Sequence, residues 1–484
     1  MRIILHTPIT YIFKEAVMAV KIIFLVIFFA VMIGVGLYSR KHATNVNDFV
    51  LGGRSVGPWL TAFAYGTSYF SAVGFVGYAG QFGYKYGLSA TWIGIGNAII
   101  GSLLAWVILG SRTRSMSKAL SAATMPDFFG KRYDSNGLKI AASAISFIFL
   151  IPYTASVYNG LSRLFGMAFD IPYAVCVIAM AALTGIYVIM GGYMATAIND
   201  FIQGIIMLIG IVAVIMAVLN GQGGFYEAVR SLSEIESDIP LTMGQKGVFA
   251  SFFGPDFPNL LGVVVLTSLG TWGLPQMVHK FYAIRDEKAI RYGTIISTLF
   301  AMVVSGGCYY LGGFARLFDT PAIYTEDGSI IYDAIIPSIL STLPDLLIGI
   351  VIVLVLSASM STLSSLVLTS SSTLTLDLIK GNLIKDMDEK KQLLYMRILL
   401  VFFIVISVII ALDPPPFIAQ LMGISWGALA GAFLAPFMYG LYWKGVTKAA
   451  VWASFACGVL LTVSNMFLKF IASPINAGAI VMLA

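Results

Sequence analysis

The run of residues 356–377, LSASMSTLSSLVLTSSSTLTLD, lies in a long apolar context, yet twelve of its 22 residues are Ser or Thr. On a helix, Ala358, Ser361, Thr362 and Ser365 fall on one face, because positions three and four apart are neighbours. Their hydroxyls, together with any carbonyl released from the helix, would form a cluster of neutral oxygens. A small, hard, monovalent cation accepts such oxygens without full charge compensation. The run therefore predicts an alkali-cation site.

A second interpretation of the same run stays open at this point. Ser and Thr also hold transmembrane helices together, and their hydroxyls often bond back to the carbonyl four residues earlier. The spacing alone does not separate packing from ion binding.

The composition predicts a helical membrane protein. Of the 484 residues, 58% are hydrophobic and 11% are charged, whereas soluble domains have about 25% charged residues. The apolar runs are about 20 residues long, as transmembrane helices require, rather than short and alternating as in a barrel. The net charge of +6 does not indicate nucleic-acid binding, because most basic residues lie in short loops.

Few residues are suited to other chemistry. The three cysteines lie in apolar runs and the three histidines are scattered, so neither a disulfide framework nor a zinc site is expected. The sequence shows no nucleophile–base set, and we expect no enzyme activity. The first apolar run has no cleavage site after it and is expected to remain as a helix.

The apolar runs predict twelve helices, and these are residues 17–38, 59–81, 88–109, 139–167, 173–190, 195–219, 260–278, 294–317, 346–376, 398–412, 416–442 and 449–470. Lys and Arg collect in alternate loops, with Lys280 counted in the loop after residue 278. The positive-inside rule places these loops in the cytoplasm and the N-terminal tail, 1–16, outside. The acidic loops 220–248 and 319–345 are then expected to face out.

Two of these helices carry helix breakers. Gly66, Gly74 and Gly77 interrupt residues 59–81. Gly270, Gly273 and Pro275 interrupt residues 260–278. Paired broken helices mark the midplane binding sites of transporters, although glycine also permits close helix packing. The spacing of the two fits two repeats, residues 59–219 and 249–443.

Asp200, in MGGYMATAINDFIQG, is an acidic residue near the start of a predicted helix. A carboxylate inside a bilayer needs a partner, and an ion or the hydroxyls of residues 356–377 would serve. At the membrane surface it would instead be a solvated residue or a helix cap.

Four motifs together resemble the sodium/solute symporter family, and they are DFVLGGRSVGPWLTA, PYTASVYNGLSRLFG, GGYMATAINDFIQ and SASMSTLSSLVLTSSS. The resemblance extends from residue 17 to the end of the chain. It implies an all-α, polytopic LeuT-like fold, with inverted five-helix repeats and flanking helices. It also implies thirteen helices, so the segment 447–484 is expected to hold one C-terminal helix and a truncated last one.

The resemblance implies a main Na⁺ site formed by the carbonyls of Thr67, Phe70 and Ala358 and the hydroxyls of Ser361 and Thr362. Some members hold a second Na⁺, and the matching residues here are Asp200, Ser361, Ser364 and Ser365.

The substrate contacts differ from those of the known carriers. The proline carriers have an aspartate where this chain has Tyr69 and a tryptophan where it has Val73. They have aromatic residues at the positions of Thr267 and Thr271. The sugar carriers have a glutamine at Gly74. The candidate substrate contacts in this chain are Ser71, Val73, Gly74, Gln81, Tyr153, Thr267, Thr271, Trp272, Pro275 and Gln276.

These observations predict a sodium-coupled symporter of the cell membrane that imports a small organic solute by alternating access. A monocarboxylate, pantothenate or an amino acid such as proline would fit. No obligate protein partner is inferred. The alternatives are a proton-coupled carrier of the same fold and, less favoured, a channel or a membrane sensor.

Overall fold

The computed structural model describes residues 8–169, 172–380, 382–384, 386–413 and 418–483. These residues form helices joined by loops, and their only extended pairings are isolated bridges such as the one between Val56 and Ile284.

The helices of the first half of the chain are α1 (Pro8–Ser39), α2 (Val46–Leu51), α3 (Pro58–Tyr69), α4 (Ala79–Tyr86), α5 (Thr91–Gly96), α6 (Ser111–Ala119), α7 (Met125–Arg132), α8 (Asn136–Phe169), α9 (Tyr173–Gly221) and α10 (Phe225–Ser233). Those of the second half are α11 (Phe257–Leu269), α12 (Pro275–Ala283), α13 (Glu287–Gly312), α14 (Tyr332–Ser341), α15 (Asp345–Thr373), α16 (Glu389–Leu412), α17 (Ile418–Tyr442), α18 (Lys448–Leu468) and α19 (Pro474–Leu483). Wider π-helical turns form η3 (Val73–Tyr78), η5 (Asn97–Leu104), η6 (Trp106–Gly110) and η12 (Leu374–Ile379), and the 3₁₀ turn η9 covers Gly270–Gly273.

Within the described residues, nine helical segments are long and apolar enough to cross a membrane, or ten if one bent pair is counted as a span. Two of them, Val73–Ala119 and Tyr173–Gly221, have 47 and 49 residues, about twice what a bilayer requires. Each is divided by a glycine at positive φ, Gly87 (62°) in the first and Gly192 (53°) in the second. The predicted boundaries between residues 81 and 88 and between 190 and 195 are therefore confirmed.

The first broken helix is interrupted at a different place from the glycines. α3 ends at Tyr69, and Phe70 is extended (φ −102°, ψ 99°) before η3 begins at Val73. Gly66 lies inside α3, where a Cβ atom would come within 2.4 Å of the Phe300 ring. Gly66 thus serves close packing, and the break leaves the last carbonyls of α3 without helical N–H partners.

The second broken helix is interrupted where the sequence predicts. α11 gives way to η9 at Gly270, and α12 begins with Pro275 at its first position, where proline costs no hydrogen bond. The two arms are bent by 48°.

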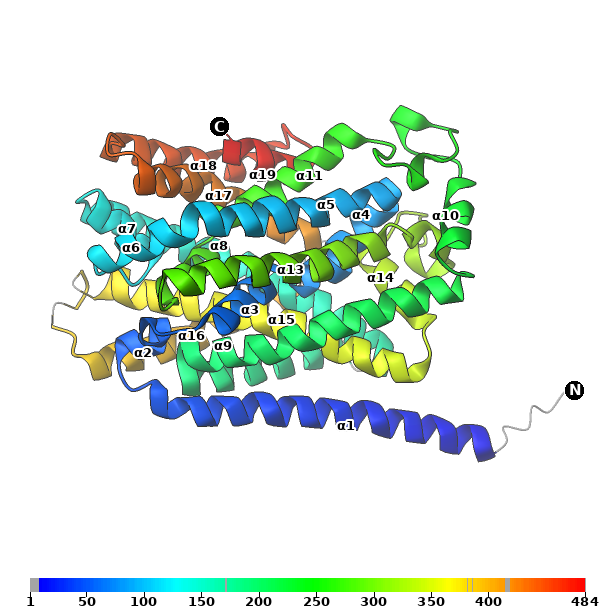
Figure 1. The fold of residues 1–484 in the computed structure, drawn as a ribbon, viewed down its shortest axis with the longest axis horizontal. Coiled ribbons are helices and arrows are strands. Elements are labelled where there is room, and N and C mark those ends of the chain that lie inside the picture. The colour runs from blue at the N-terminus through cyan, green and yellow to red at the C-terminus, as the bar shows by residue number, and fades with distance from the viewer. Residues whose placement is uncertain (1–7, 170–171, 381, 385, 414–417, 484) are drawn as a thin grey trace, which may run out of the picture.

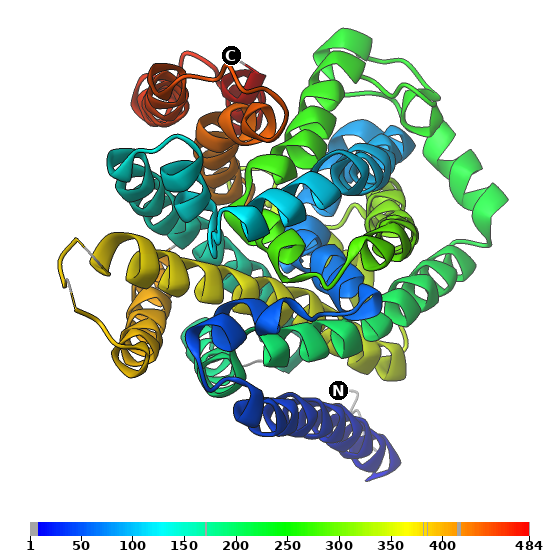
Figure 2. The same cartoon turned by 60° about the vertical axis from the view of Figure 1, so that its left-hand side comes forward.

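α15 runs through the middle of the bundle and α1 lies along its outside (Figures 1 and 2). In the most apolar window of Leu347–Ile379, 78% of residues are buried, against 22% for Lys21–Ser39. The Ser/Thr-rich run is therefore surrounded by protein, which is what polar groups at membrane depth require.

The short helices between spans were not predicted. α2 and α7 are each capped by a side chain that accepts from a backbone N–H, Asn45 from that of Asp48 and Thr124 from that of Asp127, and such caps were a usable signal. The predicted tail 1–16 is wrong in its second half, because α1 begins at Pro8. Residues 1–7, and residue 416 at the start of one predicted helix, lie outside the described residues.

Candidate functional site

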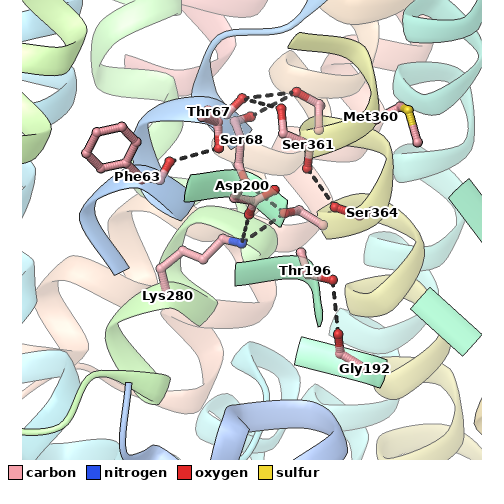
Figure 3. A network of polar contacts seen from close by, with 12 residues as sticks. Phe63, Thr67, Ser68, Gly192, Thr196, Asp200, Lys280, Met360, Ser361 and Ser364 are labelled. Atoms are coloured by element: carbon pink, nitrogen blue, oxygen red, sulfur yellow. Dashed lines mark hydrogen bonds and ion pairs between the residues drawn. The ribbon is translucent and has the colours of Figure 1, made fainter. Parts of the chain in front are cut away.

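Backbone and hydroxyl oxygens bring the end of α3 into polar contact with the middle of α15 (Figure 3). The Ser361 hydroxyl lies 3.2 Å from the Thr67 carbonyl and 2.8 Å from the Ser357 carbonyl one turn earlier on its own helix. The Thr362 hydroxyl lies 3.4 Å from the same carbonyl and 3.5 Å from that of Ser68. Both hydroxyls also approach the Ala358 carbonyl, at 3.3 and 3.2 Å.

These separations suit a cation of the size of Na⁺. Ca²⁺, which has a similar radius, binds oxygen at about 2.3–2.6 Å, so neighbouring ligands around such an ion lie about 3.3–3.7 Å apart. Ser361 and Thr362 are fully buried. The cluster provides carbonyls from two helices and two hydroxyls that can rotate their lone pairs inward, with no formal charge.

Four of the five residues expected at this position therefore lie together: Thr67, Ala358, Ser361 and Thr362. Phe70 occupies the extended break after α3, and the contacts to α15 described above are made by Thr67 and Ser68 instead. Ser68 is a member of the cluster that the sequence did not indicate.

A second polar cluster adjoins the first and contains two opposite charges (Figure 3). The Asp200 carboxylate of α9 lies 3.7 Å from the Lys280 ammonium of α12, and both side chains are at most 2% exposed. Lys280 also donates to the Ser365 hydroxyl at 2.9 Å. Ser365 in turn lies 2.7 Å from the Ser68 hydroxyl.

The prediction that Lys280 lies in the loop after residue 278 is wrong. The bent helix continues through Ala283 and places this lysine inside the bundle. The expected ligands of a second Na⁺ also separate in part. Ser364 donates to the Ser361 carbonyl at 2.9 Å, while Asp200 and Ser365 face Lys280.

A narrow cavity of about 20 Å³, little more than the space for one water molecule, lies beside the two helix breaks. Its lining includes Gly74 and Thr267, both expected from the sequence, and Phe70, Asn97, Tyr309 and Trp426, which were not expected. Among the residues that the structure describes, no charged side chain lines it. Tyr69, also in the lining, donates from its hydroxyl to the Thr267 carbonyl at 2.6 Å and so joins the two broken helices.

Three buried polar side chains, Ser71, Tyr153 and Trp426, lie at or near this cavity. The Tyr153 ring packs edge-on against Trp426, with centroids 5.8 Å apart, and its hydroxyl lies near Ser71 and the Trp426 indole. The polar atoms of these three side chains are buried and lie close to one another, but none of them makes a hydrogen bond of good geometry. Buried polar groups are normally satisfied, so these atoms suit a bound solute.

The remaining candidate substrate residues are dispersed. Trp272 donates its indole N–H to the Ile100 carbonyl at 3.0 Å, and Thr271 bonds back to Ser268, so both are engaged within the protein. Gln276 is buried with its amide unpaired. Val73 and Pro275 are buried outside the cavity lining.

A larger vestibule, of about 650 Å³, has Gln81, Lys85, Asp256 and Arg316 in its lining. Its lining also includes Asp238, in the loop after α10, and Tyr332, at the start of α14, and Figure 1 shows these two helices at one end of the bundle. Gln81 therefore belongs to an entrance rather than to the cavity.

At the end of the bundle opposite to α10 and α14, charged side chains make contacts between helices. Arg54 donates to the Ala122 carbonyl at 2.6 Å. Asp377 of η12 accepts from the Thr124 hydroxyl at 2.5 Å and lies 3.5 Å from the Lys139 ammonium. These contacts join the end of α15 to α7 and α8.

Comparison with known proteins gives consistent matches. The profile of the sodium:solute symporter family matches residues 49–458. Sodium/proline symporters of Staphylococcus aureus strains JH9 and JH1 are each 32% identical over 455 residues, covering 91% of this chain and 85% of the relative.

Solved structures share the fold. A Na⁺-coupled sialic acid symporter in a substrate-bound, outward-open state superposes with a TM-score of 0.79 at 17% identity, over 96% of this chain and 95% of that chain. A nucleobase-cation-symport-1 family transporter in a closed conformation gives a TM-score of 0.50 at 12% identity, over 90% and 92%. The all-α, LeuT-like architecture is thereby confirmed.

Proposed function

The chain belongs to the sodium:solute symporter family, and we propose that it imports a small organic solute with Na⁺ bound between α3 and α15. The family is one of transporters rather than enzymes. The observation that carries the ion assignment is the convergence of the Thr67 carbonyl with the Ser361 and Thr362 hydroxyls.

Na⁺ at this position would link two elements that must move relative to each other. With the ion bound, the free carbonyls of α3 are held against α15. When the ion leaves, only the weaker hydroxyl–carbonyl contacts remain. Coupling needs only that the ion and the solute favour the same state, typically by about 1–3 kcal/mol. The membrane potential adds about 2.3 kcal/mol per charge per 100 mV.

The direction of transport follows from the two ends of the bundle. The vestibule opens towards the acidic loops that the positive-inside rule places outside the cell. The Arg54, Lys139 and Asp377 contacts close the basic end. In the proposed cycle, Na⁺ and solute enter through the vestibule, and those contacts break to release them into the cytoplasm.

The lining of the cavity suits a compact solute with a polar group, and the cavity, at about 20 Å³ in this conformation, must widen to admit one. Among the described residues its lining is uncharged and includes five aromatic side chains, while Ser71, Tyr153 and Trp426 place polar atoms nearby. With no cationic side chain in the described part of this lining, Na⁺ would supply the positive charge next to a solute carboxylate. Proline, the solute named for the Staphylococcus aureus relatives, and small monocarboxylates or pantothenate are the proposed substrates.

The test is uptake by the purified chain in proteoliposomes. Labelled proline, pantothenate, lactate, pyruvate and sialic acid are offered under an inward Na⁺ gradient, an inward proton gradient, or neither. Accumulation of one solute that requires the Na⁺ gradient supports the proposal. Accumulation driven by protons without Na⁺ would identify a proton-coupled carrier instead.

A further inference from the structure

Lys280 and Asp200 form a charge pair in the bundle interior. Among the ion pairs between described residues, it is the one in which both side chains are at most 2% exposed. The ammonium also lies 5.4 Å from the centroid of the Tyr193 ring, whose electron-rich face attracts cations. The Lys280 ammonium thus has a carboxylate, a hydroxyl and an aromatic face around it.

The oxygens around Lys280 include two of those expected to bind a second Na⁺. Asp200 supplies the charge and Ser365 a hydroxyl. An ammonium is monovalent like Na⁺ and has three donors for such oxygens. With Lys280 in place, Asp200 is already paired, and a Na⁺ added there would share one carboxylate with a second cation at close range.

Two serine residues, Ser365 and Ser68, connect this ammonium to the proposed Na⁺ site. Ser365 contacts the Ser68 hydroxyl at 2.7 Å, and the Ser68 carbonyl lies 3.5 Å from the Thr362 hydroxyl. The two positions are therefore neighbours, since Thr362 and Ser365 are three residues apart and lie on the same face of α15.

On the basis of the sodium coupling proposed above, we propose that the Lys280 ammonium is a tethered cation that fills the second cation position. The protein then binds one Na⁺, at the Thr67–Ser361–Thr362 cluster. A tethered charge does not dissociate, so the contact between α9, α12 and α15 holds at any Na⁺ concentration. Only the contact between α3 and α15 remains sensitive to Na⁺.

The test counts ions directly and needs no substrate. Equilibrium binding of ²²Na⁺ is measured on the purified full-length chain in lipid nanodiscs. The comparison set is wild type, Lys280→Gln, the double variant Asp200→Asn/Lys280→Gln, and Lys288→Gln, which removes an exposed lysine at the start of α13. Each protein is first checked for a single symmetrical peak in size-exclusion chromatography.

We expect one bound Na⁺ in wild type and in Lys288→Gln, and two in Lys280→Gln, where Asp200 regains a free coordination position. The double variant has a neutral pair of similar shape and is expected to return to one. Two bound ions in wild type, or one in folded Lys280→Gln, would overturn the inference. If Lys280→Gln does not fold, the decision rests on wild type and the double variant, which are expected to bind one ion each, with affinities within about threefold.

Failure of the proposed function has a different signature. If wild type shows no saturable ²²Na⁺ binding at all, the proposed sodium coupling is wrong. The proposed role of Lys280, which depends on that coupling, is then wrong as well. Two ions in wild type would leave sodium coupling intact and remove only the tethered cation.

Discussion

The hydroxyls of Ser361 and Thr362 are the side chains on which the proposed ion site depends. Their types and spacing predict an oxygen-lined face of α15, and the family resemblance supplies the partner carbonyl of Thr67. Ser68 could not be predicted, since its contribution depends on where α3 ends. Lys280 was missed because its sequence position, shortly before Arg285 and Lys288, is typical of a cytoplasmic loop. Its apolar neighbours Val278 and Phe281 were the available signal.

Removal of a ligand hydroxyl should weaken Na⁺ binding. A hydrogen-bonding interaction with a charged group contributes about 1.5–3 kcal/mol, so Thr362→Ala should raise the Na⁺ concentration for half-maximal uptake by about 10- to 100-fold. Sodium titration of uptake in proteoliposomes measures this. Ser359→Ala is the matched control, because that hydroxyl bonds only back to Val355 on its own helix. Equal sodium curves for Thr362→Ala and Ser359→Ala would contradict the assigned ligands.

The buried pair should show strong coupling in stability. Removing one partner of a buried ion pair costs about 3–5 kcal/mol because the other charge is left alone, whereas removing both charges together is often nearly neutral. Asp200→Asn and Lys280→Met should therefore each lower the melting temperature markedly, and the double variant should recover most of the loss. Thermal unfolding of the purified variants measures this. Additive losses in the double variant would show that the two side chains are not paired.

At the scale of the elements, the two helix breaks put backbone oxygens and a cavity at the centre of the bundle. The break at Gly270–Gly273 could be predicted, since glycine and proline stand at the break itself. The break at Phe70 could not be located, because Gly66, the glycine that precedes it, serves helix packing against Phe300. The short helices α10 and α14 also escaped prediction, since apolar run length was the only signal used.

Close packing of α4 on α13 predicts different effects of alanine substitution at Gly83 and at Gly306. A Cβ atom on Gly83 would lie 2.0 Å from the Gly312 carbonyl oxygen, whereas one on Gly306, also on α13, would meet nothing within 4 Å. Overpacking typically costs about 1–3 kcal/mol, so Gly83→Ala should destabilise the fold by about that amount or more. Gly306→Ala should be tolerated. The yield and melting temperature of the purified variants measure the effect, and equal values for both would contradict the packing.

For the whole molecule, the charge distribution predicts orientation as well as fold. Alternating basic and acidic loops place the ends of the bundle on opposite sides of a membrane, and the structure separates them accordingly (Figure 1). Composition and resemblance were sufficient for the LeuT-like class. The size of the cavity and the way the charged end closes could not be predicted, since both depend on contacts between segments more than 200 residues apart, such as that of Thr124 with Asp377.

Cysteine labelling tests the orientation. In a variant whose three native cysteines are replaced, Ser329→Cys in the acidic loop should react with a membrane-impermeant maleimide in intact cells. Lys390→Cys, in the first turn of α16, should react only after the membrane is permeabilised. Both positions are exposed, so access depends on the side of the membrane. The opposite pattern would invert the topology and the proposed direction of import.

The central claim is that an alkali cation binds between the end of α3 and the middle of α15. The most direct measurement is a crystal structure of the protein with Tl⁺ replacing Na⁺, in which anomalous scattering locates the ion independently of any assumed ligand. The account predicts a peak in contact with the Thr67 carbonyl and the Ser361 and Thr362 hydroxyls. A fully occupied Tl⁺ site elsewhere, with those oxygens still bonded to one another, would contradict it.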